Sequence, residues 1–564
     1  DRSPSRGLGD VYKRQSLVTL PFTYMSTNSP LSVTPTRQNN ESGKFQSNEK
    51  QHQQERLTLS SVLNVLWSSI ALASDGYNSQ SISSAGSMLK ILYPSELGRN
   101  SYKGEMSSRV SSAYYVGLCL GSLCFGFLID RYSRKAGMML ATCLMIIGVA
   151  LCTGSWGKNP HMMFWMLTVS RGILGFGAGG EYPVCSTGAT EAGDETPAVR
   201  RRRGLIVGIV GCTSIDMGIV FGGLFPLCIL AGFGYTSTTS KNETMHLGAA
   251  WRTTLGLGCV IPATVFYFRW RIVNSKAFSN HSITKRMDIK LLWIAIKTYW
   301  TRMLGCCLTW FLYDFCTYPY NLLTPDIVKG LPGNHKNLIV SIGYSCVLNA
   351  FLVPGCIFGS FALDYFGRRN TMALGFLTQS ILAYVLAGAL IPIETTFPLF
   401  IVLYGVMMSL GEFGPGVTTL LVSSECFPTA FRGHFVGLAA AVAKAGAAIG
   451  TVVFNNILNA YATDENDTTP KGLRVVVFVG ASVSVIGLIL TLLFIPNDKN
   501  RDLNMEDVRF RQILADHGFG DAFDKPDYDS MTSDSSCKDF ISKEAILPTL
   551  SYNERNGTTT VFSK

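Results

Sequence analysis

The chain has 564 residues and a net charge of +10, yet only 15% of its residues are charged, compared with about 25% in soluble domains. Residues 57–496 hold only 51 of the 86 Lys, Arg, Asp and Glu residues. A segment of 440 residues with so few charges cannot form an ordinary soluble surface, which excludes a soluble enzyme. The basic residues flank apolar runs instead of forming one patch, which argues against nucleic acid as a partner.

The first 58 residues are predicted to be a disordered cytoplasmic tail, because 16–58 are polar and rich in Ser, Asn and Gln. The chain begins with Asp1 rather than Met, and residues 1–15 resemble a translated library adapter. These fifteen residues are therefore set apart from the fold.

Apolar runs of about 18–25 residues follow, a length that crosses a bilayer as a helix. They predict an all-α membrane protein with twelve transmembrane helices, six in an N-terminal bundle at 59–268 and six in a C-terminal bundle at 302–496. The predicted spans are 61–82, 107–129, 136–156, 161–184, 205–231, 250–268, 302–323, 338–363, 371–391, 398–422, 435–457 and 473–495.

Lys and Arg gather in alternate loops, above all in the basic central loop at 269–301, and so predict a cytoplasmic location for these loops. Both termini, including the tail at 497–564, are then cytoplasmic, and the plasma membrane is the expected location. The sequons at Asn242 and Asn466 fall in loops predicted to lie outside. The run Arg200-Arg-Arg-Arg203 is interpreted as a determinant of this topology.

An internal repeat relates the two bundles. Asp130-Arg-Tyr-Ser-Arg134 matches Asp364-Tyr-Phe-Gly-Arg368 at an offset of 234, and the same offset takes Glu191 to Glu425. Two related halves joined in parallel are typical of transporters whose site lies near the midplane between the halves.

Two motifs carry a resemblance to the major facilitator superfamily. The segment Gly126–Lys135, which contains Asp130 and Arg134, resembles its cytoplasmic loop motif, although Ser133 stands where glycine is usual. Arg171-x-x-x-Gly-x-Gly-x-Gly179 resembles its fourth-helix motif. The resemblance implies a twelve-helix transporter in which Asp130, Arg134, Asp364 and Arg368 gate the cytoplasmic side.

Further motifs resemble the phosphate:proton symporter family. These are Gly-Gly-Glu181-Tyr182-Pro, Trp310-x-x-x-Asp314-x-x-x-Tyr318 and Lys444-Ala-Gly. Gly416 and Ser214 replace the Asn and Gln of phosphate-specific members, which predicts a larger pocket. Ser-Asp75-Gly-Tyr and the motif that begins at Asp507 are most similar to the glycerophosphodiester (glycerophosphoinositol) permeases.

Ionisable groups inside membrane spans are costly, so each is a candidate site residue. They are Asp75, Arg171, Glu181, Asp216, Asp314, Glu412 and Lys444. We expect Lys444 to bind the anionic substrate and to pair with Asp314 when the site is empty. Trp310, Asp314 and Tyr318 share one helix face, and Tyr182 completes the substrate-binding set.

Proton coupling is assigned to Glu181, with Arg171 tuning it and Asp75 as a second carboxylate on the path. No histidine lies in the middle of a predicted span, so a proton relay must use carboxylates. Asp216 and Glu412 are candidates for a direct role that the sequence leaves open.

The predicted function is a proton-coupled symporter that imports a glycerophosphodiester such as glycerophosphoinositol or glycerophosphocholine. Inorganic phosphate is the alternative substrate, and a non-transporting nutrient sensor is the alternative class. The partners are a small anion, protons and the lipid bilayer, and the expected unit is a monomer. No cofactor and no metal site are expected, since no Cys-x-x-Cys pair occurs among the 15 Cys.

Overall fold

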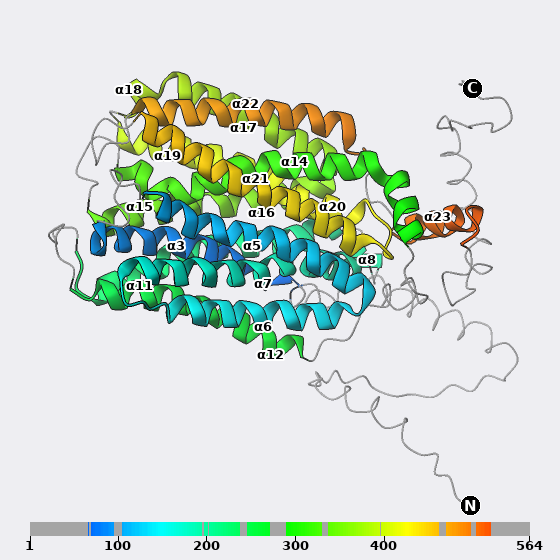
Figure 1. Ribbon diagram of the computed structural model, residues 1–564. Helices are drawn as coiled ribbons and strands as arrows, with labels where there is room; N and C mark the ends of the chain where they lie inside the picture. The colour runs from blue at the N-terminus through cyan, green and yellow to red at the C-terminus, as the bar shows by residue number, and fades with distance from the viewer. Residues whose placement is uncertain are drawn as a thin grey trace, which may run out of the picture. The chain divides into compact units, whose positions relative to one another are not determined.

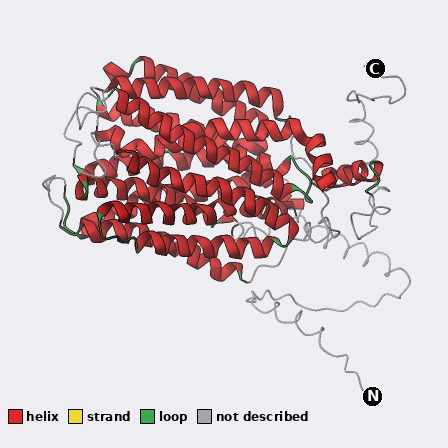
Figure 2. Cartoon of the chain, in the orientation of Figure 1, coloured by secondary structure: helices red, strands yellow, loops and turns green. Residues whose placement is uncertain are grey.

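The computed structural model describes residues 66, 69–94, 104–194, 197–200, 202–236, 245–270, 289–329, 337–394, 396–461, 470–497 and 503–519. In these ranges the secondary structure is helical and contains no strand (Figure 2). The predicted N-terminal tail up to residue 58, both sequons and residues 520–564 lie outside the described residues.

Six helical spans form the first half of the chain (Figure 1). They are α3 (Leu72–Leu92), α5 (Gly104–Arg131), α6 (Arg134–Thr153), α7 (Pro160–Asp194), a fifth span composed of α9 (Arg203–Val207), η2 (Gly208–Cys212) and α10 (Thr213–Gly232), and a sixth composed of α11 (Leu247–Gly256), η3 (Leu257–Cys259) and α12 (Val260–Arg269). The short α8 (Pro197–Arg200) precedes the fifth span.

Six more spans form the second half. They are α14 (Ile289–Lys329), α15 and α16 (Leu338–Ala350 and Leu352–Tyr365), α17 (Arg368–Gly388), a span of α19 (Phe397–Gly411), η4 (Glu412–Gly416) and α20 (Val417–Glu425), then α21 (Arg432–Ala460) and α22 (Pro470–Phe494). The short α18 (Leu390–Glu394) lies between α17 and α19, and α23 (Leu503–Asp516) follows the last span.

The described residues thus confirm the predicted twelve-helix fold. Eight of the spans are long and apolar enough to cross a membrane by length and composition. Spans that fall short of this criterion include α3, α7 and α14, which carry the ionisable residues Asp75, Glu181 and Asp314. Their lower apolarity follows from the groups that make them candidates for function.

Several predicted boundaries differ from the structure; the fourth span, for example, was predicted to end at residue 184, but α7 continues to Asp194. The first span was predicted to end at residue 82, but α3 continues to Leu92 with its Ser-rich face buried. The seventh was predicted to begin at residue 302, but α14 begins at Ile289. The added turns bury Leu291, Ala295 and Tyr299, which recur every four residues on one helix face, so packing extends the helix beyond its apolar run.

The structure shows the internal repeat as paired contacts. The hydroxyl groups of Thr190 in α7 and Ser424 in α20, which are 234 residues apart, lie 2.6 Å from each other. Arg134 pairs with Glu191 at 2.9 Å, and the equivalent Arg368 pairs with Glu425 at 3.0 Å. Equivalent residues therefore make equivalent contacts in the two halves.

The two halves pack through matching helices, α5 against α21 and α10 against α15. Gly126 in α5 permits the first contact, because a Cβ atom there would lie 2.6 Å from the carbonyl oxygen of Gly433. Small residues at such positions let membrane helices approach closely. Large apolar side chains such as Phe358 and Leu493 are instead exposed, as expected for a lipid-facing surface.

Candidate functional site

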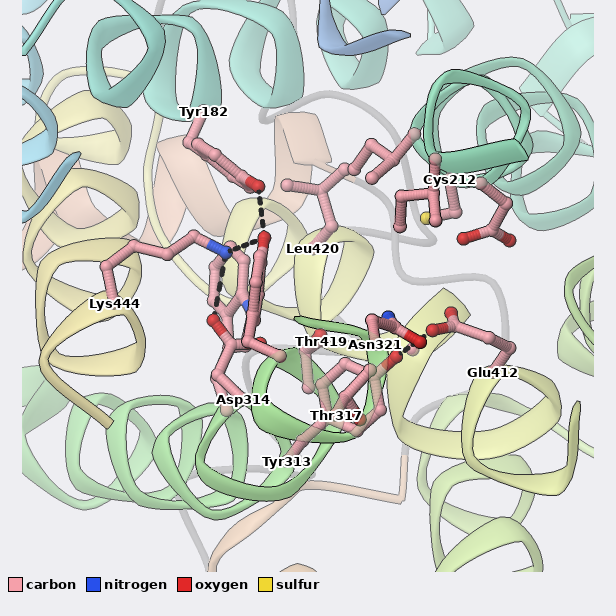
Figure 3. A pocket seen from close by; sticks show the side chains of 16 residues that line it. Tyr182, Cys212, Tyr313, Asp314, Thr317, Asn321, Glu412, Thr419, Leu420 and Lys444 are labelled. Carbon is pink, nitrogen blue, oxygen red and sulfur yellow. Dashed lines mark hydrogen bonds and ion pairs between the residues drawn. The ribbon is translucent and has the colours of Figure 1, made fainter. Parts of the chain in front are cut away.

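A cavity lies between the two halves (Figure 3). Helices of both halves line it, with α7, η2 and α10 on one side and α14, η4, α20 and α21 on the other. The lining residues are Tyr182, Cys212, Ile215, Asp216, Ile219, Trp310, Tyr313, Asp314, Thr317, Tyr318, Asn321, Glu412, Gly416, Thr419, Leu420 and Lys444.

Lys444 is the cation of this cavity. Its Nζ lies 2.9 Å from Oδ2 of Asp314 and donates to the Tyr318 hydroxyl at 2.6 Å. The same ammonium lies 4.2 Å from the ring centre of Tyr182 and 5.8 Å from that of Trp310. A buried ammonium needs such compensation, and the carboxylate, the hydroxyl and the aromatic faces supply it. The five residues predicted to bind substrate therefore lie together.

A chain of hydrogen bonds leads from Lys444 to Asp75 in α3. The Tyr182 hydroxyl donates to Oδ2 of Asp75 at 2.5 Å, and the Tyr114 hydroxyl donates to Oδ1 at 2.6 Å. Because the Tyr182 proton is committed to Asp75, Tyr318 donates to Tyr182 over their 2.9 Å contact. A single directional chain thus connects the ammonium to the Asp75 carboxylate.

The far end of the cavity is acidic. Figure 3 shows Glu412 and Asn321 on the side away from Lys444, and Glu412 accepts a hydrogen bond from the Tyr313 hydroxyl. Asp216 is 2% exposed and Asn321 is 5% exposed. Oδ2 of Asp216 and Oδ1 of Asn321 have no hydrogen-bond partner in the part of the chain that the structure describes. Buried acceptors are therefore left unsatisfied at this end.

Gly416 and Ser214, the two small residues expected to enlarge the pocket, differ in where they lie. Gly416 lines the cavity, but a Cβ atom there would lie 2.1 Å from Oε2 of Glu412 and 2.7 Å from the Tyr313 hydroxyl. The space that Gly416 leaves is therefore filled by Glu412. Ser214 is not among the residues that line the cavity, and its hydroxyl donates to the Val210 carbonyl, so its effect on the size of the pocket stays a prediction.

Glu181 lies outside the cavity, in a closed cluster of its own. Its carboxylate contacts Arg269 at 2.7 Å, and it accepts hydrogen bonds from Thr142 at 2.9 Å and Cys185 at 3.3 Å. Sequence reasoning missed Arg269, which was assigned to the basic loop but ends α12 and is fully buried. An arginine directly after an apolar span was the only available signal.

Arg171 does not contact Glu181 as expected. Its guanidinium donates to the Asn78 carbonyl at 2.8 Å and lies 4.3 Å from the ring centre of Tyr114. Since Tyr114 donates to Asp75, Arg171 lies next to the Asp75 cluster instead. The assignment of Arg171 to the tuning of Glu181 stays a prediction.

The four predicted gating residues lie at one end of the bundle, which we call the charged end and which also includes Glu191 and Glu425. Asp130 pairs with Arg134, and Asp364 pairs with Arg368 at 3.4 Å. Each pair is linked further to a glutamate, Arg134 to Glu191 and Arg368 to Glu425. Arg203, one of the four arginines interpreted as a topology determinant, is buried and contacts Glu425 at 2.7 Å.

The aspartates of the charged end also tie the two halves together. Asp130 accepts from the backbone N–H groups of Gly433 at 3.1 Å and His434 at 2.8 Å, at the start of α21. Asp364 accepts from those of Gly204 at 3.1 Å and Leu205 at 2.9 Å, at the start of α9. A carboxylate at a helix N-terminus satisfies free N–H groups and complements the helix dipole. The charged end is therefore closed by two equivalent caps.

The structure explains why Ser133 can replace the glycine that is usual in the loop motif. Its repeat equivalent, Gly367, adopts φ 87°, a conformation that favours glycine. Ser133 has φ −171°, which any residue adopts, and its hydroxyl accepts a hydrogen bond from the N–H of Ala136 as the N-cap of α6.

The fold and the site define a membrane transporter. Residues 65–282 and 272–510 match the family described as Sugar (and other) transporter, and the chain belongs to this family. A solved structure of the major facilitator proton:xylose symporter XylE of E. coli has a TM-score of 0.62, with 14% sequence identity over 80% of this chain and 99% of that chain. The predicted superfamily is thereby confirmed.

Several curated proteins are more similar to this chain in sequence than the solved structures are. The chain is 36% identical to Glycerophosphoinositol permease 1 of Candida albicans, over 84% of this chain and 85% of that protein. It is 34% identical to Glycerophosphoinositol transporter 1 of Saccharomyces cerevisiae, over 83% and 86%. A more distant relative, Probable inorganic phosphate transporter 1-6 of Arabidopsis thaliana, is 26% identical over 78% and 92%.

Proposed function

We propose that this protein is a proton-coupled symporter that imports a glycerophosphodiester across the plasma membrane, with the charged end and both termini in the cytoplasm. The observation that carries the proposal is Lys444, a buried cation that faces a cavity between two transporter halves. The permease relatives support the choice of substrate class.

The phosphate group binds at Lys444. A phosphodiester is a monoanion, so it competes with Asp314 for the ammonium and accepts hydrogen bonds from the same donors. Tyr318 and Tyr182 already contact Lys444 and each other, and they provide hydroxyl groups for the remaining phosphate oxygens. Charge-assisted hydrogen bonds of this kind are the stronger ones in proteins.

Proton coupling follows the hydrogen-bond chain to Asp75. An anion that binds at Lys444 draws Tyr318 and then Tyr182 toward itself, which weakens the hydrogen bond that stabilises the charged form of Asp75. Loss of that hydrogen bond favours protonation of the carboxylate. Substrate and proton therefore load together. Glu181, the first sequence-based candidate, pairs with Arg269 away from the cavity, so its role in coupling stays a prediction.

The alternative substrate is inorganic phosphate, which the distant relatives favour. It would use Lys444 in the same way but would leave the acidic end of the cavity unoccupied. A nutrient sensor on this scaffold would bind the anion and show no uptake.

The test is uptake by the purified protein in liposomes with an inward proton gradient. Labelled glycerophosphoinositol should accumulate, unlabelled glycerophosphodiesters should compete, and collapse of the gradient should abolish accumulation. Lys444→Ala should lose uptake. Lys158→Ala is the matched control, because Lys158 is exposed. Uptake of phosphate alone, or equal activity in both variants, would contradict the proposal.

A further inference from the structure

The cavity has a second polar pole, which we call the acidic pole and which consists of Asp216, Glu412 and Asn321. Asp216 follows η2 at the start of α10, Glu412 begins η4, and Asn321 lies in α14, so both halves contribute. Among the described residues neither carboxylate has an ion-pair partner. Lys444, the cation of the cavity, is already paired with Asp314.

The acidic pole is rich in unused acceptors. Asp216 and Asn321 are at least nine-tenths buried, yet Oδ2 of Asp216 and Oδ1 of Asn321 accept no hydrogen bond. Leaving a buried acceptor unsatisfied costs about 1–3 kcal/mol. Both residues line the cavity, so a molecule in the cavity is the available source of donors.

The backbone is shaped around this pole. The fifth and tenth spans both contain a π-helical turn, η2 and η4, and these turns supply or precede the two carboxylates. Turns of this kind are rare and occur frequently at functional sites. Within η4, Gly416 leaves room for the Glu412 side chain, which any larger residue would displace.

The chemistry of the pole selects hydroxyl groups over a quaternary ammonium. Carboxylate and amide oxygens accept hydrogen bonds, and adjacent hydroxyls on a polyol supply several donors at once. A quaternary ammonium has no N–H to donate and is bound by aromatic faces. The aromatic faces of Tyr182, Tyr318 and Trp310 lie around Lys444, at the other pole, whereas the aromatic residue in contact with the acidic pole, Tyr313, donates its hydroxyl to Glu412.

We propose that the acidic pole is the subsite for the polyol arm of the substrate, so that Lys444 holds the phosphate while Asp216, Glu412 and Asn321 accept hydrogen bonds from the hydroxyls of the arm. The inference rests on the proposed transport of glycerophosphodiesters. It assigns a preference for polyol phosphodiesters over phosphocholine diesters and over inorganic phosphate.

The experiment measures uptake of labelled glycerophosphoinositol into liposomes that contain the protein. Glycerophosphocholine and inorganic phosphate are added outside as competitors. Asp216→Ala should raise the half-saturation concentration for glycerophosphoinositol about tenfold, the loss expected for one hydrogen bond. Inhibition by phosphate should change less than twofold, since phosphate contacts only the Lys444 pole. Asp516→Ala is the matched control, because it also removes a carboxylate but Asp516 is exposed and is not among the residues that line the cavity.

Conservative variants separate this role from proton binding. Asp216→Asn and Glu412→Gln keep an acceptor oxygen, so each should retain part of the selectivity for the polyol, whereas a proton-binding role would be lost as fully as in the alanine variants. Asn321→Ala, which removes no charge, should lower the affinity for glycerophosphoinositol as well. The Asn321→Ala variant therefore still tests the subsite if an Asp216 variant fails to fold.

Three outcomes would overturn the inference. They are equal losses for glycerophosphoinositol and phosphate, a loss specific to glycerophosphocholine, or a change only in proton-driven accumulation with unchanged competition. Failure of the proposed function would look different, because the unmodified protein would then take up no phosphodiester at all.

Discussion

At the scale of single residues, three of the buried carboxylates, Asp314, Glu181 and Asp75, are compensated in two different ways. Lys444 and Asp314 neutralise each other at the cavity, and Glu181 and Arg269 do so away from it. Asp75 is held by two tyrosine hydroxyls, with no cation in hydrogen-bond contact. Of the three, Asp75 is therefore the carboxylate whose charge depends most on hydrogen bonds that a substrate can alter.

Asp75→Asn tests that dependence. We expect the variant to lose proton-driven accumulation of glycerophosphodiester while it retains exchange of labelled for unlabelled substrate, because the amide keeps the size of the side chain and removes its titration. Accumulation and exchange are measured in the same liposomes. Loss of both would mean that Asp75 holds the substrate or the fold.

Glu181→Gln tests the ion pair with Arg269. Removing one partner leaves a buried guanidinium uncompensated, which costs about 3–5 kcal/mol in comparable cases. We expect a lower melting temperature, and recovery of much of the loss in the double variant Glu181→Gln, Arg269→Gln. A single variant with unchanged melting temperature that loses only accumulation would instead support the sequence-based assignment of Glu181 to proton transfer.

At the scale of helices, the two halves are held at the charged end by caps that cross between them. Asp130 in α5 caps α21, and Asp364 in α16 caps α9. Both caps must break before the halves can separate at this end. Their free energy therefore stabilises the conformation in which the charged end is closed, to which the protein must return in every transport cycle.

Asp130→Ala should slow transport without weakening binding. Loss of the cap removes two acceptors from the start of α21 and destabilises the closed charged end by about 0.5–2 kcal/mol. We expect uptake to fall several-fold, while the affinity of the detergent-solubilised protein for glycerophosphoinositol is unchanged. The exposed neighbour Arg131→Ala serves as the control. A parallel loss of affinity would place Asp130 in the path of the substrate.

The helix α23 reinforces the same end. Asp507 accepts hydrogen bonds from the backbone N–H and the hydroxyl of Thr429, each at 2.6 Å, and Phe510 packs against Tyr299 and Phe431. The Thr429 carbonyl in turn accepts from Arg134 at 3.4 Å. Helix α23 thus contacts the loop that leads into α21, the helix that Asp130 caps.

Asp507→Ala should weaken this contact. Two buried hydrogen bonds to a carboxylate are lost, and at about 1.5–3 kcal/mol each they exceed the effect of an average surface substitution. We expect a clear decrease in melting temperature relative to Asp516→Ala, a change at an exposed position of the same helix. Equal melting temperatures would show that α23 adds nothing to the stability of the charged end.

At the scale of the whole molecule, import of an anion works against an inside-negative membrane potential of about 2.3 kcal/mol per charge per 100 mV. Two protons imported with each monoanion give a net inward movement of one positive charge. The membrane potential then favours import. We therefore expect uptake to rise when liposomes are polarised inside-negative at equal pH on both sides. Uptake that is independent of the potential would indicate one proton per anion.

The sequence by itself determined the twelve-helix architecture, the repeat and most of the residues around Lys444. These depend on the length of apolar runs, on a constant offset and on motifs that lie within single helices, all of which are local properties. Trp310, Asp314 and Tyr318, for example, share a helix face because of their spacing alone.

Only the tertiary structure decided which charges meet. Arg269 pairs with Glu181, Arg171 joins the Asp75 cluster, and the Ser214 hydroxyl bonds to the Val210 carbonyl. Each outcome depends on contacts between helices far apart in the chain or on the π-helical turns that rotate the following residues. The period of a regular helix contains no information about either, so the acidic pole at Asp216 and Glu412 became visible only when the two halves were packed together.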